Sequence, residues 1–327
     1  MKRTNDIKKV LVTILMAAML IGCEQSQTTN ETNQESENFD LKIGVLNTAD
    51  SAVLFAAKSD NLFEAYDVKV ELIEFGSASD QSKAVEAGQI DGVMTDLIVQ
   101  GLINKSEDCH LKSVLTTLGE KVENGKFVIA AAPGNAHNTI DKLHGAKIAI
   151  SEGTGMEFLV DSYCDILGIN LDSIQKVNVP SISLRMEMLL EGGDIDCAIL
   201  PEPLGDYSVM KGTQIVIDDT QLDENLSSSV ISIQDSYIEK NPENVKNFID
   251  AYAEAAKRVN ENKDTYRQLV LEVANVPKEM HDSYVIPDYS ERNVPDEELF
   301  NRVQTWMVNK GLIDEPYDYE YMVTQFK

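Results

Sequence analysis

The chain has 327 residues, and its 55 acidic and 28 basic side chains give a formal net charge of −27 at pH 7. A balance this acidic excludes a nucleic-acid-binding protein, because such proteins need a basic surface. The four histidines are scattered, and the four cysteines have neither the spacing of a disulfide framework nor that of a zinc site. We therefore expect no metal and no cofactor.

The N-terminal residues have the pattern of an export signal. Basic side chains precede an apolar run over residues 10–21, which is too short to span a bilayer comfortably. The run ends at Gly22-Cys23, which resembles the bacterial lipobox, whose cysteine is diacylated and becomes the mature N-terminus. We expect a signal peptide over residues 1–22 and a lipid anchor on Cys23 that holds the protein to the outer side of the cell membrane. The alternative is a plain signal peptide or membrane anchor whose cysteine is incidental.

The composition changes abruptly after Cys23. Residues 24–38 contain Glu, Gln, Ser, Thr and Asn and no aliphatic side chain. Such a segment cannot bury enough apolar surface to offset the entropy of ordering it. We expect residues 23–39 to be a flexible tether between the membrane and a folded body.

The body contains an internal repeat with an offset of 105 residues. The stretch AGQIDGVM, near residue 90, corresponds to GGDIDCAI, near residue 195. The same offset aligns residues 41–46 with 146–151 and residues 68–73 with 173–178. Two copies of a β-α-β-α-β unit predict two similar lobes, each with its own sheet. The most closely matched pairs are Gly88 and Gly193, Ile90 and Ile195, and Asp91 and Asp196.

In each lobe we predict three strands that alternate with helices, an arrangement typical of sheets covered on both faces. Thr48 or Asp50 is the expected N-cap of the first helix, and Gly88 and Gly168 are expected to end helices. The predicted strands are 41–46, 67–75 and 92–95 in the first lobe and 146–150, 174–179 and 197–200 in the second.

Two extended stretches, 127–132 and 228–233, are expected to cross between the lobes. Two further helices follow: one begins at Asn241-Pro242 with Asn241 as its cap, and the other covers residues 296–309. The sequence does not indicate which lobe they cover. We assign residues 40–127 and 231–327 to the first lobe and residues 128–230 to the second.

In open α/β sheets, ligands bind beyond the carboxyl ends of the strands, beside helix N-termini. The residues that leave the predicted strands in the two lobes are small, hydroxylic, glycine or acidic, which suits a small polar solute. Each of them alone is also an ordinary helix-capping residue, and this is the alternative. The predicted ligand-binding residues are Asn47, Thr48, Asp50, Gly76, Ser77, Ser79, Thr95 and Asp96 from the first lobe and Glu152, Gly153, Thr154, Gly155, Ser181 and Glu202 from the second.

The charges and donor groups of these residues indicate which kind of solute would bind. The acidic side chains favour a ligand with an amine or other cationic group. Gly153-Thr154-Gly155 covers only half of a dinucleotide fingerprint, so we interpret it as a nest for an anion or carboxylate. Arg185 is the only basic residue near the strand exits; it pairs either with an anionic ligand group or with surface carboxylates, and we favour the latter.

The combined motifs resemble a family of receptors for ABC importers, the extracytoplasmic solute-binding proteins of the nitrate/sulfonate/taurine and thiamine-pyrimidine (NMT1/THI5-like) type. The motifs are the lipobox, residues 87–91, 139–150, 153–157 and 192–198, Glu202-Pro203, and Asn241-Pro242-Glu243.

The resemblance implies a type II periplasmic-binding-protein fold, with two doubly wound mixed α/β sheets joined by a two-strand hinge. It also implies closure of the lobes over one ligand and delivery of that ligand to an ABC permease, but it does not fix the ligand. We expect a lipid-anchored monomer and a small solute that is amine-containing or heteroaromatic. We expect no enzyme, because no His or Cys lies at the strand exits. An enzyme on the same fold, related to pyrimidine-precursor synthases, and an extracellular sensor without transport are the alternatives.

Overall fold

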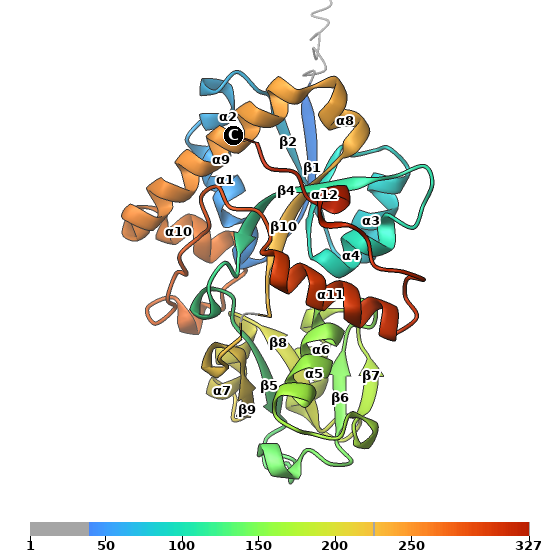
Figure 1. The fold of residues 1–327 in the computed structure, drawn as a ribbon. Helices are drawn as coiled ribbons and strands as arrows, with labels where there is room; N and C mark the ends of the chain where they lie inside the picture. Colours follow the sequence, from blue (N-terminus) through green and yellow to red (C-terminus); the bar gives the residue numbers. More distant parts are fainter. Residues whose placement is uncertain (1–38, 225, 327) are drawn as a thin grey trace, which may run out of the picture. The chain divides into compact units, whose positions relative to one another are not determined.

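The computed structural model describes residues 39–224 and 226–326. The predicted signal peptide, Cys23 and the tether up to residue 38 lie outside the described residues. Among the described residues no helix is long and apolar enough to cross a membrane. The described part contains two five-stranded sheets, each with helices packed against it (Figure 1).

The first sheet has the strand order β2-β1-β3-β10-β4. β1 pairs in parallel with β2 and β3, and β10 is antiparallel to both β3 and β4. The sheet is therefore mixed, as the fold class predicts. Its strands are β1 (Leu41–Leu46), β2 (Val70–Phe75), β3 (Gly92–Thr95), β4 (Leu111–Leu118) and β10 (Ser229–Gln234).

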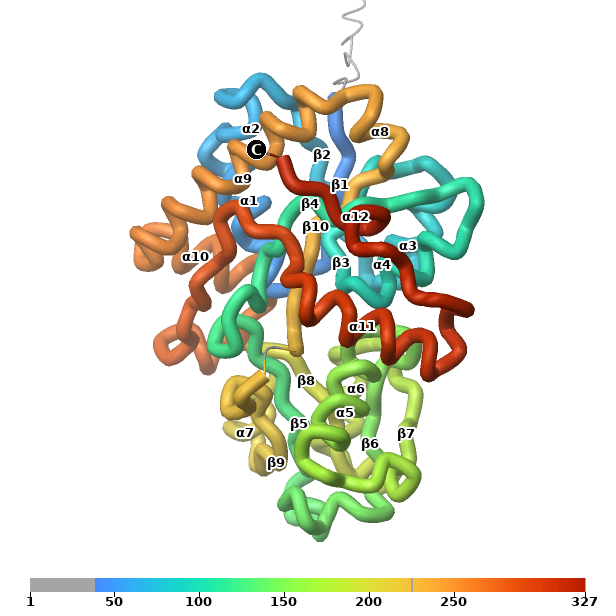
Figure 2. The backbone as a smooth tube through the Cα atoms, viewed as in Figure 1, coloured from blue at the N-terminus to red at the C-terminus, as the bar shows by residue number. Residues whose placement is uncertain are grey.

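The second sheet has the order β7-β6-β8-β5-β9, with β6 parallel to β7 and β8 and with β5 antiparallel to β8 and β9. The chain passes from the first sheet to the second between β4 and β5 and returns between β9 and β10. Figure 2 shows both crossings at the junction of the two lobes. The strands are β5 (Phe127–Ala131), β6 (Lys147–Ile150), β7 (Gln175–Asn178), β8 (Cys197–Pro201) and β9 (Gln214–Asp218).

The sequence repeat has a structural counterpart, because β6, β7 and β8 take the same places in their sheet as β1, β2 and β3. The repeated aspartates make equivalent hydrogen bonds in both lobes. Asp91 accepts a hydrogen bond from the backbone N–H of Lys42 (2.8 Å), and Asp196 accepts one from that of Lys147 (2.9 Å). Each carboxylate thus joins the turn before the third strand of the unit to the first strand.

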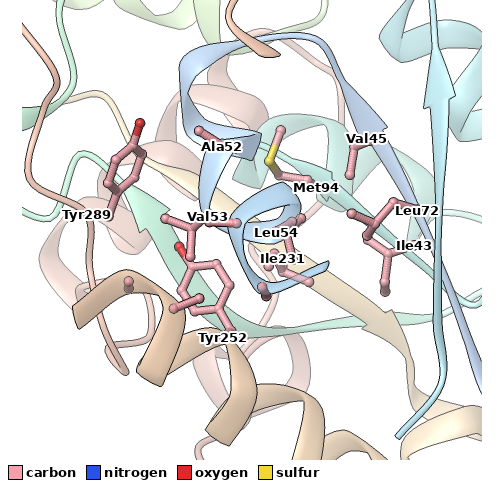
Figure 3. Close-up of a cluster of buried hydrophobic side chains, with 14 of the residues drawn as sticks. Ile43, Val45, Ala52, Val53, Leu54, Leu72, Met94, Ile231, Tyr252 and Tyr289 are labelled. Carbon is pink, nitrogen blue, oxygen red and sulfur yellow. The ribbon is translucent and has the colours of Figure 1, made fainter. Parts of the chain in front are cut away.

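Helices cover both faces of the first sheet. α1 (Ala52–Ser59), α2 (Leu62–Ala65), α9 (Pro242–Glu261) and α10 (Lys263–Val273) form one layer, and their apolar stripes pack on Ile43, Leu72 and Ile231 (Figure 3). α3 (Ala78–Glu86) and α4 (Leu97–Ile103) lie on the opposite face, where Val85 and Val99 are buried with Val93.

The second sheet is covered by α5 (Gly155–Ile166) on one face and by α6 (Ile182–Glu191) and α7 (Leu204–Met210) on the other. α11 (Glu297–Asn309) shares one buried cluster with α4 and with α5, so it contacts both lobes. The late helices are therefore divided, since α9 and α10 cover the first lobe and α11 bridges the two. The remaining helices are α8 (Asp235–Lys240), α12 (Tyr319–Met322) and short 3-10 helices at Ala49–Ser51, Val122–Asn124, Ile140–Lys142, Leu171–Ser173, Asp219–Gln221 and Lys278–Met280.

Two predicted N-caps differ from the structure. Neither Thr48 nor Asp50 caps through its side chain, because a 3-10 turn (Ala49–Ser51) precedes α1. Asn241 precedes α9, but its amide donates back to the carbonyl oxygen of Tyr237 instead of accepting from the helix. The helix stop at Gly88 is confirmed by its left-handed backbone (φ 66°).

Candidate functional site

A cavity of about 1210 Å³ lies where the carboxyl ends of the parallel strands of both sheets meet. A space of this size accommodates a small organic solute. Every residue predicted for ligand binding, from Asn47 in the first lobe to Glu202 in the second, lines this cavity. The structure therefore brings the whole predicted set together.

Asp96 connects the two lobes at the edge of the cavity. One carboxylate oxygen accepts hydrogen bonds from the backbone N–H groups of Ile98 and Val99 (both 2.9 Å) and caps α4. The other oxygen accepts from the N–H of Gly155 at the start of α5 (3.0 Å). Burial raises the pKa of Asp96 although these hydrogen bonds work against it. Asp96 thus joins two helix N-termini, one from each lobe.

The glycine amides of the second lobe are already satisfied by carboxylates of the chain. The N–H of Gly153 donates to Glu157 (2.9 Å), as that of Gly155 does to Asp96. The glycine amides therefore bind carboxylates, as the interpretation as a nest for an anion or carboxylate predicts, but in this structure these carboxylates belong to the chain. The acceptors come from the protein itself, and Glu157 is held in turn by Lys176 and Lys310 (3.1 and 2.6 Å).

Several other predicted residues have structural roles. Ser77, Thr154 and Ser181 accept hydrogen bonds from the first turns of α3, α5 and α6. Asn47 donates to Glu74 (2.8 Å). For Ser77, Thr154 and Ser181 the capping alternative holds, although these three residues and Asn47 all line the cavity.

A second group of lining side chains is uncommitted. Asp50, Ser79, Thr95 and Glu152 make no side-chain hydrogen bond or ion pair with any residue within 39–224 and 226–326. Two of them are carboxylates and two are hydroxyls, and both lobes contribute. They are the groups that remain available to a polar solute.

Glu202 belongs to a charged cluster at the crossing between the lobes. Lys126 contacts Glu202 (3.3 Å), Asp206 (2.6 Å) and Asp218 (4.0 Å). Burial raises the pKa of Glu202 to about 7; Lys126 opposes this shift and Asp206 adds to it. Burial would lower the pKa of Lys126, but the hydrogen bond to Asp206 and the charge of Glu202 raise it.

Sequence reasoning missed Lys126, Asp206 and Tyr284, which also line the cavity. Lys126 is the only basic side chain in the part of the lining that the structure describes. The pKa of Tyr284 is raised by its burial and by the nearby charges of Glu202, Asp50 and Asp206. Tyr284 could not be found as a strand exit, because it lies in a loop after α10 that returns to the first lobe.

Arg185 differs most from expectation. Its side chain is 0% exposed, and no carboxylate of the described residues lies within ion-pair distance, so the favoured pairing with surface carboxylates is wrong. Nη1 donates to the sulfur of Met156 (2.8 Å), whereas Nε and Nη2 have no hydrogen-bond partner among the described residues. Burial lowers the pKa of Arg185 to about 10.

The described lining contains neither His nor Cys, and no group of three or more metal-ligating side chains occurs in the residues described. Cys109, Cys164 and Cys197 are buried free thiols. Burial raises the pKa of each, to about 11, 11 and 12. Such thiols are protonated at neutral pH and are poor nucleophiles.

Comparison with solved structures shows that this two-lobed architecture is the periplasmic-binding-protein fold. The aliphatic sulphonate binding protein SsuA of Escherichia coli matches with a TM-score of 0.71 at 19% identity, over 88% of this chain and 93% of that one. The nitrate-binding protein NrtA of Synechocystis PCC 6803 matches with 0.64 at 16% identity, over 86% and 83%. The desulfurization enzyme DSZB matches with 0.61 at 14% identity, over 86% and 96%.

The family is shown by the sequence itself. Residues 34–274 match the model of the NMT1-like family. No curated protein matches the chain. The chain belongs to the NMT1-like family, which confirms the family predicted from its motifs.

Proposed function

We propose that the protein is an extracytoplasmic receptor that binds a small polar solute in the cavity between its lobes and delivers it to an ABC importer. The observation that carries the proposal is the meeting of uncommitted polar side chains from both lobes in one cavity. A solute held by groups of both lobes favours the closed arrangement over an open one, because it gains all its contacts only when the lobes are together. The binding proteins SsuA and NrtA, which share the fold, support the proposal of a solute-binding receptor.

The ligand-binding residues that we propose are the set predicted from the strand exits. Asp50, Ser79, Thr95 and Glu152 would contact the solute directly, whereas Asp96 and the capping hydroxyls would set the positions of the helices around it. The ionisable groups of the described lining are acidic apart from Lys126. This charge favours a solute with an amine or other cationic group, which would lie near Asp50 and Glu202, two of the three carboxylates whose charges raise the pKa of Tyr284.

The remaining parts of the proposal concern residues beyond those described. Cys23 would carry a lipid anchor, and the polar segment after it would let the binding lobes reach a permease in the same membrane. The partner that we propose is therefore the permease of an ABC importer, with the receptor acting as a monomer.

The experiment that tests the receptor is a thermal-shift panel on the purified protein. It would contain thiamine pyrimidines, flavins, taurine, alkyl sulfonates, amino acids and polyamines. A cognate solute raises the stability by RT ln(1 + [L]/Kd), about 2.7 kcal/mol at a hundredfold excess over Kd. No stabilisation by any compound of the panel would count against the receptor.

An enzyme on the same fold is the second candidate, because DSZB shares the architecture. The cavity argues against it, since the described lining has no His or Cys that could form a nucleophile–base pair. Incubation with the same panel, followed by analysis for consumed compounds, separates the candidates. A receptor returns its solute unchanged.

A further inference from the structure

We propose that Asp96 is a specificity-determining residue that excludes anionic solutes, because its own carboxylate fills the place between the lobes where an anionic group of a solute would bind. The excluded groups are carboxylates, sulfonates and phosphates, whose oxygens all accept hydrogen bonds from backbone N–H groups. This role deepens the proposed function and rests on it for the presence of a solute. The occupied place itself is defined by contacts of the described residues.

Asp96 brings together backbone donors from both lobes. Its Oδ1 accepts hydrogen bonds from the N–H groups of Ile98 and Val99 (both 2.9 Å), and its Oδ2 accepts one from that of Gly155 (3.0 Å). All three partners are donors, which is the pattern of an ionised carboxylate, because a protonated one would also donate. Asp96 and Gly155 both line the cavity. A carboxylate of the chain is thus bound at the cavity in the way that the carboxylate of a solute would be.

The contacts of Asp96 go beyond ordinary helix capping, as comparison with another aspartate shows. Asp296, the N-cap of α11, accepts with Oδ1 from the N–H groups of Glu298 and Leu299 (2.8 and 3.2 Å), the same two positions of its helix. Asp296 accepts no further hydrogen bond from the described residues, and it lies outside the cavity. In Asp96 the second oxygen binds a residue of the other lobe, 59 positions further along the chain. Capping of α4 alone therefore does not account for the place of Oδ2.

The neighbouring glycine amide is occupied in the same way. The N–H of Gly153 donates to Oε2 of Glu157 (2.9 Å), while Lys176 and Lys310 contact Oε1 of the same carboxylate (3.1 and 2.6 Å). Glu157 is buried and lies between two cations, so displacing it from Gly153 would leave an uncompensated charge in the interior. The N–H groups of Gly153 and Gly155 are therefore both closed to an anion from outside.

The basic side chain of the described lining offers an anion no alternative. Lys126 has the carboxylates of Glu202, Asp206 and Asp218 within 4.0 Å of its Nζ. Three carboxylates outnumber one ammonium group, so an anion that approached Lys126 would meet a surplus of negative charge. It would lose its hydration without gaining a cation of its own, which is costly.

Exclusion of anions narrows the class of solute. A compound with a carboxylate, sulfonate or phosphate would have to displace Asp96 or enter the surplus of negative charge around Lys126. Amines and uncharged polar compounds meet neither obstacle. Of the compounds in the thermal-shift panel, taurine, alkyl sulfonates and amino acids are therefore excluded, because each carries an oxyanion. Polyamines and the panel compounds without an anionic group remain.

The test removes the carboxylate of Asp96 and returns it as a free anion. Asp96→Gly deletes a CH₂–COO⁻ group, which acetate reproduces, and glycine is an acceptable N-cap, so α4 should still form. The full chain is purified in mild detergent and melted in sodium acetate, with sodium chloride of equal ionic strength as the reference. Acetate should stabilise Asp96→Gly with an affinity about tenfold or more above that for the unaltered protein, as expected for charge-assisted hydrogen bonds. The unaltered protein should respond to acetate no more than to chloride.

Two matched variants act as controls. Asp50→Gly deletes the same group from the cavity lining, but no N–H of the described residues binds that carboxylate. Asp296→Gly deletes an exposed capping carboxylate outside the cavity. Neither variant should gain a response to acetate. If Asp96→Gly does not fold, Asp96→Ser decides the question with formate as the probe, because serine keeps a capping oxygen for α4 but lacks the second oxygen that binds Gly155.

An acetate response of the unaltered protein as large as that of Asp96→Gly would overturn the role of Asp96, and so would the absence of any response in the folded variant. Stabilisation of the unaltered protein by taurine or an alkyl sulfonate of the panel would also overturn it, and that result would leave the receptor intact. Conversely, recovery of Asp96→Gly by acetate while the panel yields no solute would support the occupied place and count against the receptor.

Discussion

Asp50 and Glu202 are the carboxylates on which the proposed cationic selectivity depends. If they hold a charged group of the solute, Asp50→Ala and Glu202→Ala each weaken binding by more than about 1 kcal/mol, the cost of losing a charge-assisted hydrogen bond. Isothermal titration with the solute found by the panel measures this. Glu64→Ala, an exposed carboxylate of α2 outside the cavity, is the matched control. Unchanged affinity in both cavity variants would move the cationic site elsewhere.

Glu202 also predicts a pH dependence of binding. Its pKa of about 7 in the free protein reflects burial first, partly opposed by Lys126. A cationic group beside it lowers that pKa, so binding releases a proton and the affinity rises as the pH increases through 7. Glu202→Gln cannot release this proton, and its affinity should vary less over the same range. Titrations in buffers of different ionisation enthalpy detect the proton directly.

Asp219, at the return crossing between the lobes, makes a separate prediction for stability. Burial raises its pKa to about 7, although Phe127 N–H and the Tyr163 hydroxyl donate to it (2.8 and 3.1 Å). Because the folded pKa lies above the ordinary value of 3.8, the stabilisation is complete below about pH 4 and is lost as the pH rises through 7. Asp219→Asn should flatten this part of the profile in denaturant unfolding at several pH values. A profile as steep as that of the unaltered protein would contradict the assignment.

At the scale of elements, the contact between α4 and α5 requires glycine at position 155. A Cβ added there would lie 3.1 Å from Oδ2 of Asp96, closer than ordinary van der Waals contact. Gly155→Ala should therefore push the two helix N-termini apart by a few tenths of an ångström. We expect a loss of about 1 kcal/mol in solute binding, as for other overpacked contacts, with the fold retained.

Gly76→Ala is the control for this substitution, because it also adds a methyl group to the lining but meets nothing within 4 Å. Equal losses of affinity in the two variants would show that the methyl group acts by filling the cavity, and that the approach of α5 to Asp96 is irrelevant to binding.

Much of the element order was predictable from sequence, for a physical reason. Strands and helices of the two lobes have strong apolar periodicity, and the repeated Gly-x-Ile-Asp stretch marks the same turn in each lobe. The surface against which a helix packs could not be predicted from its sequence in the same way. The apolar stripe of α11 indicates a buried face, but nothing in it distinguishes burial on one lobe from burial on both.

The candidate site was predictable to the extent that it follows from topology. Strand exits of parallel sheets converge, so residues such as Thr95 and Glu202 could be placed in one cavity without coordinates. Side-chain pairing could not be predicted in this way. The amide of Gly153 is taken by Glu157, and Arg185 lacks a carboxylate, and both facts depend on distances between elements that the sequence does not specify.

At the scale of the whole molecule, the lipid anchor remains a prediction about residues that precede the described part. Cys23→Ser removes the acceptor for the acyl chains, so the protein should leave the membrane fraction while its solute affinity is unchanged. Fractionation of cells that express each form, followed by titration of the released protein, measures both. A Cys23→Ser variant that stays fully with the membrane would rule out the anchor.

The contacts between the two lobes differ at the two edges of the cavity, and this difference predicts the path of the solute. Along α11 the lobes share buried side chains, and Phe158 meets Trp306 edge to face with ring centroids 5.6 Å apart. At the other edge, the exposed Lys211, which follows α7, and the Tyr207 hydroxyl of α7 donate to Glu279 at 3.3 and 3.4 Å. Separation along α11 would expose fully buried apolar side chains to water, whereas separation at Glu279 breaks solvated polar contacts and the packing of the partly buried Tyr207 ring on the first lobe. We therefore predict that the lobes separate beside α7 to admit the proposed solute, with the side bounded by α11 as the axis of that motion.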